Sequence, residues 1–296
     1  MSLSKYSIIK LLSDGIFGRV YKVKNIRNKE YYAIKKIKTI NNKTAENKNI
    51  INKIKILKYA DCPYILKLYE IYFNRSEICI VTHYANKSDL YHKISNLKKA
   101  RSFFEEDTIW NYFIQISLGI KYLHDNNIIH RDIKSSNIFI NHYNDMNVLN
   151  IGDFGISKII KRETELHRTI IGTPLYMSPE LFNNKHYNKK IDIWSLGCVL
   201  FEMVELTPPF KANTIEILSK KIRRGKYRRK SMTYSVNLTQ LIPNMLDINE
   251  SKRYSINEIL NNEFVKEKMY LVPYTEDDYN SEIDGAIYTK VTTPRS

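Results

Sequence analysis

Several residue types are scarce in this chain of 296 residues. Its three cysteines, Cys62, Cys79 and Cys198, are far apart and form no Cys-x-x-Cys pair, which argues against a zinc site and against a disulfide framework. Nine glycines and eight prolines are too few for long low-complexity linkers. Acidic residues are also few, because 31 Asp and Glu against 47 Lys and Arg leave a formal net charge of +16.

Long apolar runs are missing as well. The most apolar stretch, residues 191–206, is interrupted by Asp192, Glu202 and Glu205 and is too short to cross a bilayer. The N-terminal residues show no small-residue cleavage site, so we expect neither a signal peptide nor a transmembrane segment. Hydrophobic residues make up 43% of the chain, a globular composition, and the free cysteines favour a reducing, cytoplasmic location.

The patterning changes near residue 85. Before it, short β-branched or aromatic runs predict strands, and one charged segment with helical spacing predicts a helix. After it, long amphipathic or fully apolar periods predict helices. The expected strands are 6–12, 20–25, 31–37 and 78–82, and the expected helices 44–59, 109–123 and 191–204. This predicts an α+β fold with a small antiparallel β-sheet lobe (6–82), a hinge (83–86), a larger mainly helical lobe (87–264) and an acidic tail (265–296).

The residues with the clearest chemistry lie in two segments. Residues 130–137 read HRDIKSSN, and Asp153 begins the sequence Asp-Phe-Gly. Two carboxylates and one amide on separate loops suit phosphoryl transfer: one carboxylate and the amide hold Mg²⁺, and the other carboxylate orients a hydroxyl nucleophile. The alternative is that both Asp residues merely cap turns.

Two further segments keep the same order along the chain, GTPLYMSPE at 172–180 and DIWSLG at 192–197. Together the four segments resemble the signature motifs of eukaryotic protein kinases. HRDIKSSNIFI, IGDFGIS and the run from Arg168 to Glu180 are similar to the NIMA-related Ser/Thr kinases. The resemblance covers residues 6–264 and implies a bilobal protein-kinase-like fold that binds ATP and Mg²⁺ between its lobes and acts on protein substrates.

The resemblance assigns roles to residues of the larger lobe. Asp132 would accept or orient the proton of the substrate hydroxyl, and Lys134 would steady the transferring phosphoryl group. Asn137 and Asp153 would hold Mg²⁺, while Phe139 would lie under the adenine. Glu180 and Arg253 resemble a structural ion pair of the family, which serves folding and not chemistry.

In the smaller lobe, Leu12-Ser-Asp-Gly-Ile-Phe-Gly-Arg-Val20 resembles the glycine-rich loop over the nucleotide phosphates, with Ser13 in place of its first glycine. A plain hairpin is the alternative. Lys35 would pair with the α- and β-phosphates, and Thr82 would lie at the back of the adenine pocket. The residues expected to contact the nucleotide are Leu12, Ser13, Asp14, Gly15, Gly18, Val20, Ala33, Lys35, Thr82, Tyr84, Ala85 and Phe139.

Regulation is suggested at two positions. Thr169 lies where the family carries an activating phosphate that pairs with the Arg of the catalytic loop, here Arg131; an ordinary exposed Thr is the alternative. Lys53 stands where the family has the Glu partner of Lys35, and two facing ammonium groups repel. We therefore expect low basal activity, with a nucleotide-binding pseudokinase or scaffold as the alternative.

The segment 220–230, KKIRRGKYRRK, holds eight basic residues. Such a run is either a solvated face or a site for an acidic partner, anionic lipid, nucleic acid or the nuclear import machinery. Nucleic acid is not expected as a primary partner, because no RNA- or DNA-binding motif is present. No coiled-coil heptads follow the domain, so a monomer is expected. The family resemblance adds nuclear or microtubule locations and a role in cell division.

Overall fold

The computed structural model describes residues 3–15, 18–38, 57–73, 77–143, 145–153, 174–183, 187–230 and 233–274. Its internal contacts divide the chain into two compact units, and each is described by itself. Unit 1 comprises residues 1–60, 66–86 and 155–172, and unit 2 comprises residues 61–65, 87–154 and 173–296.

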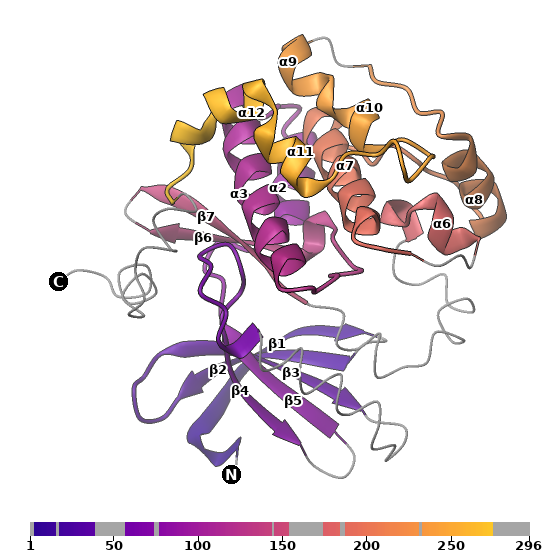
Figure 1. Ribbon diagram of the computed structural model, residues 1–296. Helices are drawn as coiled ribbons and strands as arrows, with labels where there is room; N and C mark the ends of the chain where they lie inside the picture. Colours follow the sequence, from indigo (N-terminus) through magenta and orange to yellow (C-terminus); the bar gives the residue numbers. More distant parts are fainter. Residues whose placement is uncertain are drawn as a thin grey trace. The chain divides into compact units, whose positions relative to one another are not determined.

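Unit 1 contains a five-stranded antiparallel sheet with the strand order β1-β2-β3-β5-β4 (Figure 1). A short 3-10 turn, η1 (Leu3–Lys5), precedes it. The strands are β1 (Tyr6–Gly15), β2 (Gly18–Asn25), β3 (Tyr31–Lys38), β4 (Leu68–Phe73) and β5 (Glu77–His83). Four of them extend the predicted strands by a few residues, and β4 was not predicted. The helix expected over 44–59 lies outside the described residues, except for 57–59.

One face of this sheet carries the core of unit 1. Side chains of Val23, Tyr32, Ile34, Cys79 and Val81 are buried together on it. Tyrosine rings cover this cluster, and the rings of Tyr32 and Tyr69 meet edge to face with centroids 5.0 Å apart. Since side chains alternate along a strand, the residues between these buried ones point to the opposite face of the sheet.

Unit 2 is mainly helical and also holds a two-stranded ribbon of β6 (Ile138–Tyr143) and β7 (Met146–Ile151). Its helices are α2 (Leu90–Lys99), α3 (Glu106–Asp125), α6 (Pro179–Phe182), α7 (Lys190–Glu205), α8 (Ile215–Arg224), α9 (Val236–Thr239), α10 (Leu241–Met245), α11 (Ile256–Asn261) and α12 (Glu263–Glu267). Three 3-10 turns accompany them: η2 (Ser135–Asn137), η3 (Pro174–Tyr176) and η4 (Met269–Leu271). None of the helices in the described part of the chain is both long and apolar enough to cross a membrane.

Helix α7 forms the centre of unit 2 and packs against α3 and α10 (Figure 1). Residues 191–204 are all buried, as the apolar sequence of this segment predicts. Gly197 permits the close approach of α10, because a Cβ there would lie 2.8 Å from the Cβ of Met245.

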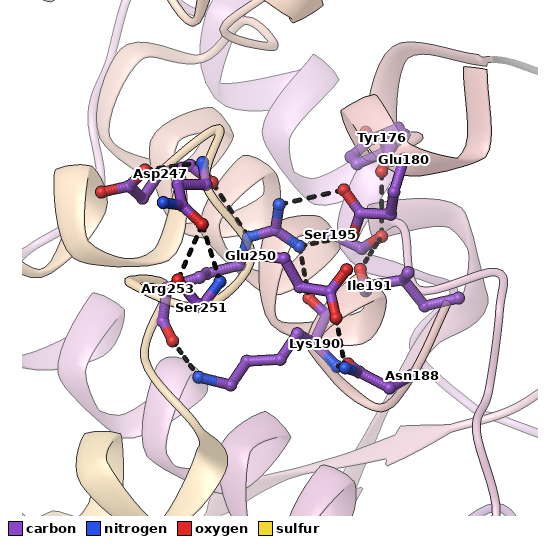
Figure 2. Close-up of polar contacts among 11 residues, drawn as sticks. Tyr176, Glu180, Asn188, Lys190, Ile191, Ser195, Asp247, Glu250, Ser251 and Arg253 are labelled. Atoms are coloured by element: carbon purple, nitrogen blue, oxygen red, sulfur yellow. Dashed lines mark hydrogen bonds and ion pairs between the residues drawn. The ribbon is translucent and has the colours of Figure 1, made fainter. Parts of the chain in front are cut away.

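The predicted ion pair between Glu180 and Arg253 is present and buried. The Arg253 guanidinium donates from Nη1 to Glu180 Oε1 at 2.7 Å and from Nη2 to Oε2 at 3.1 Å. It also donates to the backbone oxygens of Asp247 and Lys190, at 3.1 and 2.9 Å (Figure 2). Arg253 therefore joins α6, the start of α7 and the loop before α11.

The folded part of unit 2 continues past the boundary that the sequence suggested at residue 264. Helix α12 runs across this boundary, and η4 packs against α3. Tyr64 is fully buried, and its hydroxyl accepts from the backbone N–H of Tyr274 and donates to the carbonyl of the same residue. The expected acidic tail from residue 275 onward lies outside the described residues.

Candidate active site

Asp132 lies in the loop before η2, and two side chains hold its carboxylate in unit 2. Lys134 Nζ lies 3.0 Å from Asp132 Oδ2, and Asn137 Nδ2 donates to the same oxygen at 3.0 Å. Asn137 also donates to the Asp132 carbonyl oxygen at 2.8 Å. Three of the four residues predicted to be catalytic or metal-binding thus form one group, joined by an ion pair and two hydrogen bonds.

Asp192, at the start of α7, fixes the backbone of this loop. Its Oδ2 accepts from the His130 backbone N–H and its Oδ1 from the Arg131 backbone N–H, both at 2.9 Å. His124 Nε2 contacts Oδ2 at 2.9 Å. Burial alone would raise the pKa of Asp192, but the hydrogen bonds and the nearby imidazoles hold this pKa below its usual range. The carboxylate is therefore ionised and serves as a fixed acceptor.

This positioning role of Asp192 was not predicted. The sequence shows the motif at 192–197, but nothing local indicates that its first residue binds the backbone 61 and 62 residues earlier. Arg131 has a left-handed backbone, with φ of 70°. Because this conformation is unfavourable for an Arg, the two hydrogen bonds to Asp192 help to hold it.

His130 connects the Asp132 loop to the segment that precedes Asp153. Its Nδ1 lies 3.2 Å from the donating N–H of Asp132, so Nε2 carries the proton and donates to the Gly152 carbonyl at 3.0 Å. Burial lowers the pKa of His130, which keeps this ring neutral. Gly152 in turn donates its N–H to the Asn137 carbonyl at 2.9 Å. The two Asp residues are thus joined through Gly152, as a common site requires.

The donor atoms here suit Mg²⁺. The amide nitrogen of Asn137 is used by Asp132, which leaves the amide oxygen as the potential metal ligand. Asp153 adds a carboxylate and has φ of 55°, a conformation that Asp tolerates better than most residues. Mg²⁺ prefers oxygen ligands and is usually bound by one or two carboxylates together with substrate phosphates. The described residues contain no cluster of three or more His, Cys, Asp or Glu for an all-protein metal site.

Phe139 lies on β6, two residues after Asn137, and is half-buried. Its strand pairs with β7 and makes an isolated bridge with Asp89. Asp89 caps α2, because its Oδ1 accepts from the His92 backbone N–H at 2.9 Å. The position of Phe139 is therefore fixed by a ribbon and by a capped helix.

In unit 1, the residues expected to bind the nucleotide share one face of the sheet. Val20 pairs with Lys35, and Ala33 pairs with Thr82. Directly paired residues of antiparallel strands point to the same side. All four side chains therefore lie on the face opposite the buried tyrosine-rich core. Ala33, which has a small side chain, belongs to β3, and β3 lies between β2 and β5.

The hairpin between β1 and β2 contains the predicted glycine-rich loop, and Ile16 and Phe17 at its tip lie outside the described residues. Gly18 has φ of 115°, and a Cβ there would lie 2.0 Å from the carbonyl oxygen of Lys36. Glycine is thus required at this position. Ser13, which replaces the first glycine of the family motif, pairs with Val20 as a strand residue and follows a register shift at Leu12.

The remaining positions of this loop and of the hinge are also described. Asp14 is exposed and accepts from Arg19 Nε at 3.1 Å, while Gly15 pairs with Gly18. Tyr84 is half-buried, and the ammonium group of Lys22 lies 4.2 Å from the centre of its ring. Ala85 follows without regular structure, and its side chain is half-buried.

The structure thus groups the predicted residues within each unit. In unit 2, an ion pair joins Lys134 to Asp132, hydrogen bonds join Asn137 to Asp132, and Asp153 follows the bonded Gly152. In unit 1, Val20, Ala33, Lys35 and Thr82 share a sheet face. Lys53 and Thr169 lie outside the described residues, as do Phe154 and Gly155.

These arrangements, a strand-rich unit with a glycine hairpin and a helical unit with an Asp-Lys-Asn loop, define the protein kinase fold. The family model described as "Protein kinase domain" matches residues 6–265. The chain belongs to this family.

Curated proteins with similar sequences narrow the family further. The human serine/threonine-protein kinase Nek5 is 38% identical over 277 residues, which cover 92% of this chain and 38% of Nek5. Human Nek2 is 32% identical over 88% of this chain and 59% of its own length. The probable serine/threonine-protein kinase nek3 of Dictyostelium discoideum is 36% identical over 90% of this chain and 24% of its own. These similarities confirm the resemblance to the NIMA-related kinases. The chain spans between about a quarter and three fifths of these relatives.

Proposed function

We propose that this chain transfers the γ-phosphoryl group of Mg·ATP to serine or threonine hydroxyls of protein substrates. The observation that carries the proposal is the Asp132 carboxylate, held by Lys134 and Asn137 on a loop that is bonded to α7 through Asp192. A preorganised carboxylate next to a cation suits proton transfer from a hydroxyl and stabilisation of developing negative charge. Membership of the protein kinase family and the similarity to serine/threonine-protein kinases support the same activity.

Asp132 acts on the substrate hydroxyl in this proposal. Lys134 and Asn137 both contact Oδ2 of this carboxylate, and these two contacts hold it in place for the hydroxyl proton. The Lys134 ammonium, 3.0 Å from this carboxylate, supplies positive charge for the transferring phosphoryl group. Most of the acceleration comes from such positioning and charge neutralisation.

Each unit contributes its own set of residues to the proposed binding of the nucleotide. Val20, Ala33 and Thr82 offer an apolar sheet face to the adenine, and Lys35 on the same face supplies charge for the phosphates. Bound Mg²⁺ would neutralise phosphate charge, with Asn137 and Asp153 as its protein ligands. Gly18 allows backbone N–H groups to approach phosphate oxygens.

The test is transfer of radiolabelled phosphate from ATP to a protein substrate. Asp132→Asn removes the proton acceptor and should lower kcat by about 10²–10⁴. Asp145→Asn is the matched control, because Asp145 is exposed in the β6–β7 turn and Asn tolerates its φ of 62°. Nucleotide binding without any transfer would refute the proposal and indicate a pseudokinase.

We further propose that Thr169 is an activating phosphorylation site and that basal activity is low. The support is Arg131, a neighbour of Asp132 whose guanidinium lies 5.1 Å from the centre of the Tyr187 ring. A phosphate on Thr169 would pair with this guanidinium and order the segment next to the catalytic loop. Thr169→Ala should abolish activation by an upstream kinase, and Lys53→Glu should raise the unstimulated rate. An unchanged or lower rate in Lys53→Glu would show that this position does not limit catalysis.

A further inference from the structure

Several lysine side chains from separate segments of unit 2 come together outside the catalytic group. Lys98 lies near the end of α2, Lys211 in the loop after α7, and Lys230 after α8. Partial burial and the positive charges of Lys98 and Lys230 lower the pKa of Lys211. Lys221 on α8 joins them, because its Nζ donates to the Lys211 backbone carbonyl at 2.6 Å. We call these four residues the lysine cluster.

Carboxylates do not neutralise this cluster. Within the described ranges, no ion pair includes any of its four ammonium groups. Glu202 interacts with Lys211 and Lys98 electrostatically, but its side chain is only 4% exposed, and burial raises its pKa. Glu205 accepts from the backbone N–H of Lys230 at 3.0 Å rather than from its ammonium group. The cluster is therefore a site of unbalanced positive charge.

Two hydrogen bonds connect Glu202, which interacts with the charges of Lys211 and Lys98, to the catalytic loop. The Glu202 carboxylate accepts from the Tyr176 hydroxyl, and this hydroxyl lies 3.0 Å from Ser135 Oγ. Ser135 is the residue after Lys134, so this chain of bonds runs from Glu202 to the loop that holds Asp132. Helix α2, which carries Lys98, also packs against η2, the turn formed by Ser135–Asn137.

From this placement we propose that the lysine cluster is a substrate subsite that binds an acidic side chain of the protein being phosphorylated. The proposal rests on the kinase activity proposed above and adds a substrate class to it. A polypeptide whose hydroxyl reaches Asp132 must continue over the surface of unit 2, where the cluster lies. Its acidic residue would stand at a fixed number of residues from the accepting hydroxyl.

The chemistry of the cluster fits a carboxylate or a phosphate on such a polypeptide. Lysine ammonium groups are flexible point charges, which bind anions without the strict geometry that arginine imposes. The positive surface continues along α8 and the residues after it, where Lys220, Arg224, Lys226 and Arg228 are exposed. A substrate segment with more than one acidic residue would therefore bind more tightly than one with a single acidic residue.

The test compares two peptides that share one threonine and differ only in having Glu or Gln at the positions around it. The wild-type chain should show a kcat/KM about tenfold higher for the Glu peptide. Lys98→Glu/Lys211→Glu should remove this ratio, because each exposed charge pair contributes up to about fivefold. The difference should lie in KM, since the contact is equally strong before and during transfer. Lys266→Glu, the same charge change at an exposed residue of α12, should keep the ratio.

Binding of the fluorescently labelled Glu peptide, measured by anisotropy, separates this proposal from the kinase activity. If neither peptide is phosphorylated but the double variant still loses affinity for the Glu peptide, the subsite stands and the proposed activity fails. A phosphoserine peptide that outperforms the Glu peptide would identify phosphate as the preferred anion. Equal use of the Glu and Gln peptides by the wild-type chain would overturn the proposal. So would a DNA or RNA duplex that binds more tightly than the Glu peptide at physiological salt.

Discussion

Replacing Arg253 by Met should remove much of the stability of unit 2. The guanidinium makes two bonds to Glu180 and two to backbone carbonyls, and the side chain has an exposed fraction of 0% (Figure 2). Breaking a buried pair by removing one partner costs roughly 3–5 kcal/mol. Against a total stability of about 5–15 kcal/mol, this is a large fraction.

The assay is thermal unfolding followed by circular dichroism. For a domain of this size, each kcal/mol shifts Tm by roughly 2–4 °C, so Arg253→Met should lower Tm by roughly 6–20 °C. Lys252→Met, at the exposed neighbouring residue, is the matched control and should change stability by less than about 0.5 kcal/mol. The double variant Glu180→Gln/Arg253→Met should be more stable than Arg253→Met alone, because it no longer buries an unpaired carboxylate.

The pH dependence of the stability follows from the same ion pair, Glu180 with Arg253. Burial acts to raise the pKa of Glu180, but the hydrogen bonds and charge of Arg253 hold this pKa below its usual range. The pair therefore stabilises the fold above the unfolded-state pKa of about 4.3, and this contribution is lost as pH falls through the folded-state pKa. The Tm difference between wild type and Arg253→Met should shrink on acidification. A Tm unchanged by Arg253→Met, or a double variant no more stable than this single one, would refute the reasoning.

Three further predictions concern the elements that position the site. Gly18→Ala should destabilise unit 1 and weaken ATP binding, measured by calorimetry, because its Cβ would overlap the Lys36 carbonyl. Gly15→Ala, with open space around it, is the control for the loss of stability. Asp192→Asn should cost about 1–3 kcal/mol in urea unfolding and lower kcat, because its amide group cannot accept from both backbone N–H groups of the catalytic loop. Asp89→Ala should cost about 0.5–2 kcal/mol by loss of the α2 cap, whereas Asp89→Asn should retain most of the stability.

Much of the fold could be predicted because local patterns report burial directly. The apolar run at 191–204 predicted α7, and the β-branched runs predicted four of the five strands of unit 1. Strand β4 was missed because Glu70 and three aromatic residues obscure its alternation. The folded segment 265–274 was missed because two of the residues that anchor it do so through backbone groups, which carry no side-chain pattern: the Leu271 carbonyl accepts from Asn111 of α3, and the Tyr274 backbone bonds to Tyr64.

Those residues of the candidate site that belong to motifs of fixed spacing could be identified from the sequence. Asp132, Lys134 and Asn137 fall within six residues of each other, and their hydrogen bonds follow from this spacing. The role of Asp192 and the lysine cluster depends on contacts between segments far apart in the chain. Lys98 and Lys211 are isolated lysines in a lysine-rich sequence, so the sequence alone does not distinguish them.

The two bonds between Tyr64 and Tyr274 set a practical limit on how short a recombinant version of this chain can be. The family match stops at residue 265, and a protein expressed to that point would lack η4 and both of the bonds that Tyr274 makes to this enclosed phenol hydroxyl. Removing one partner of a buried hydrogen bond costs about 1–3 kcal/mol. Expression vectors for crystallisation or enzymology should therefore encode the chain at least through Tyr274.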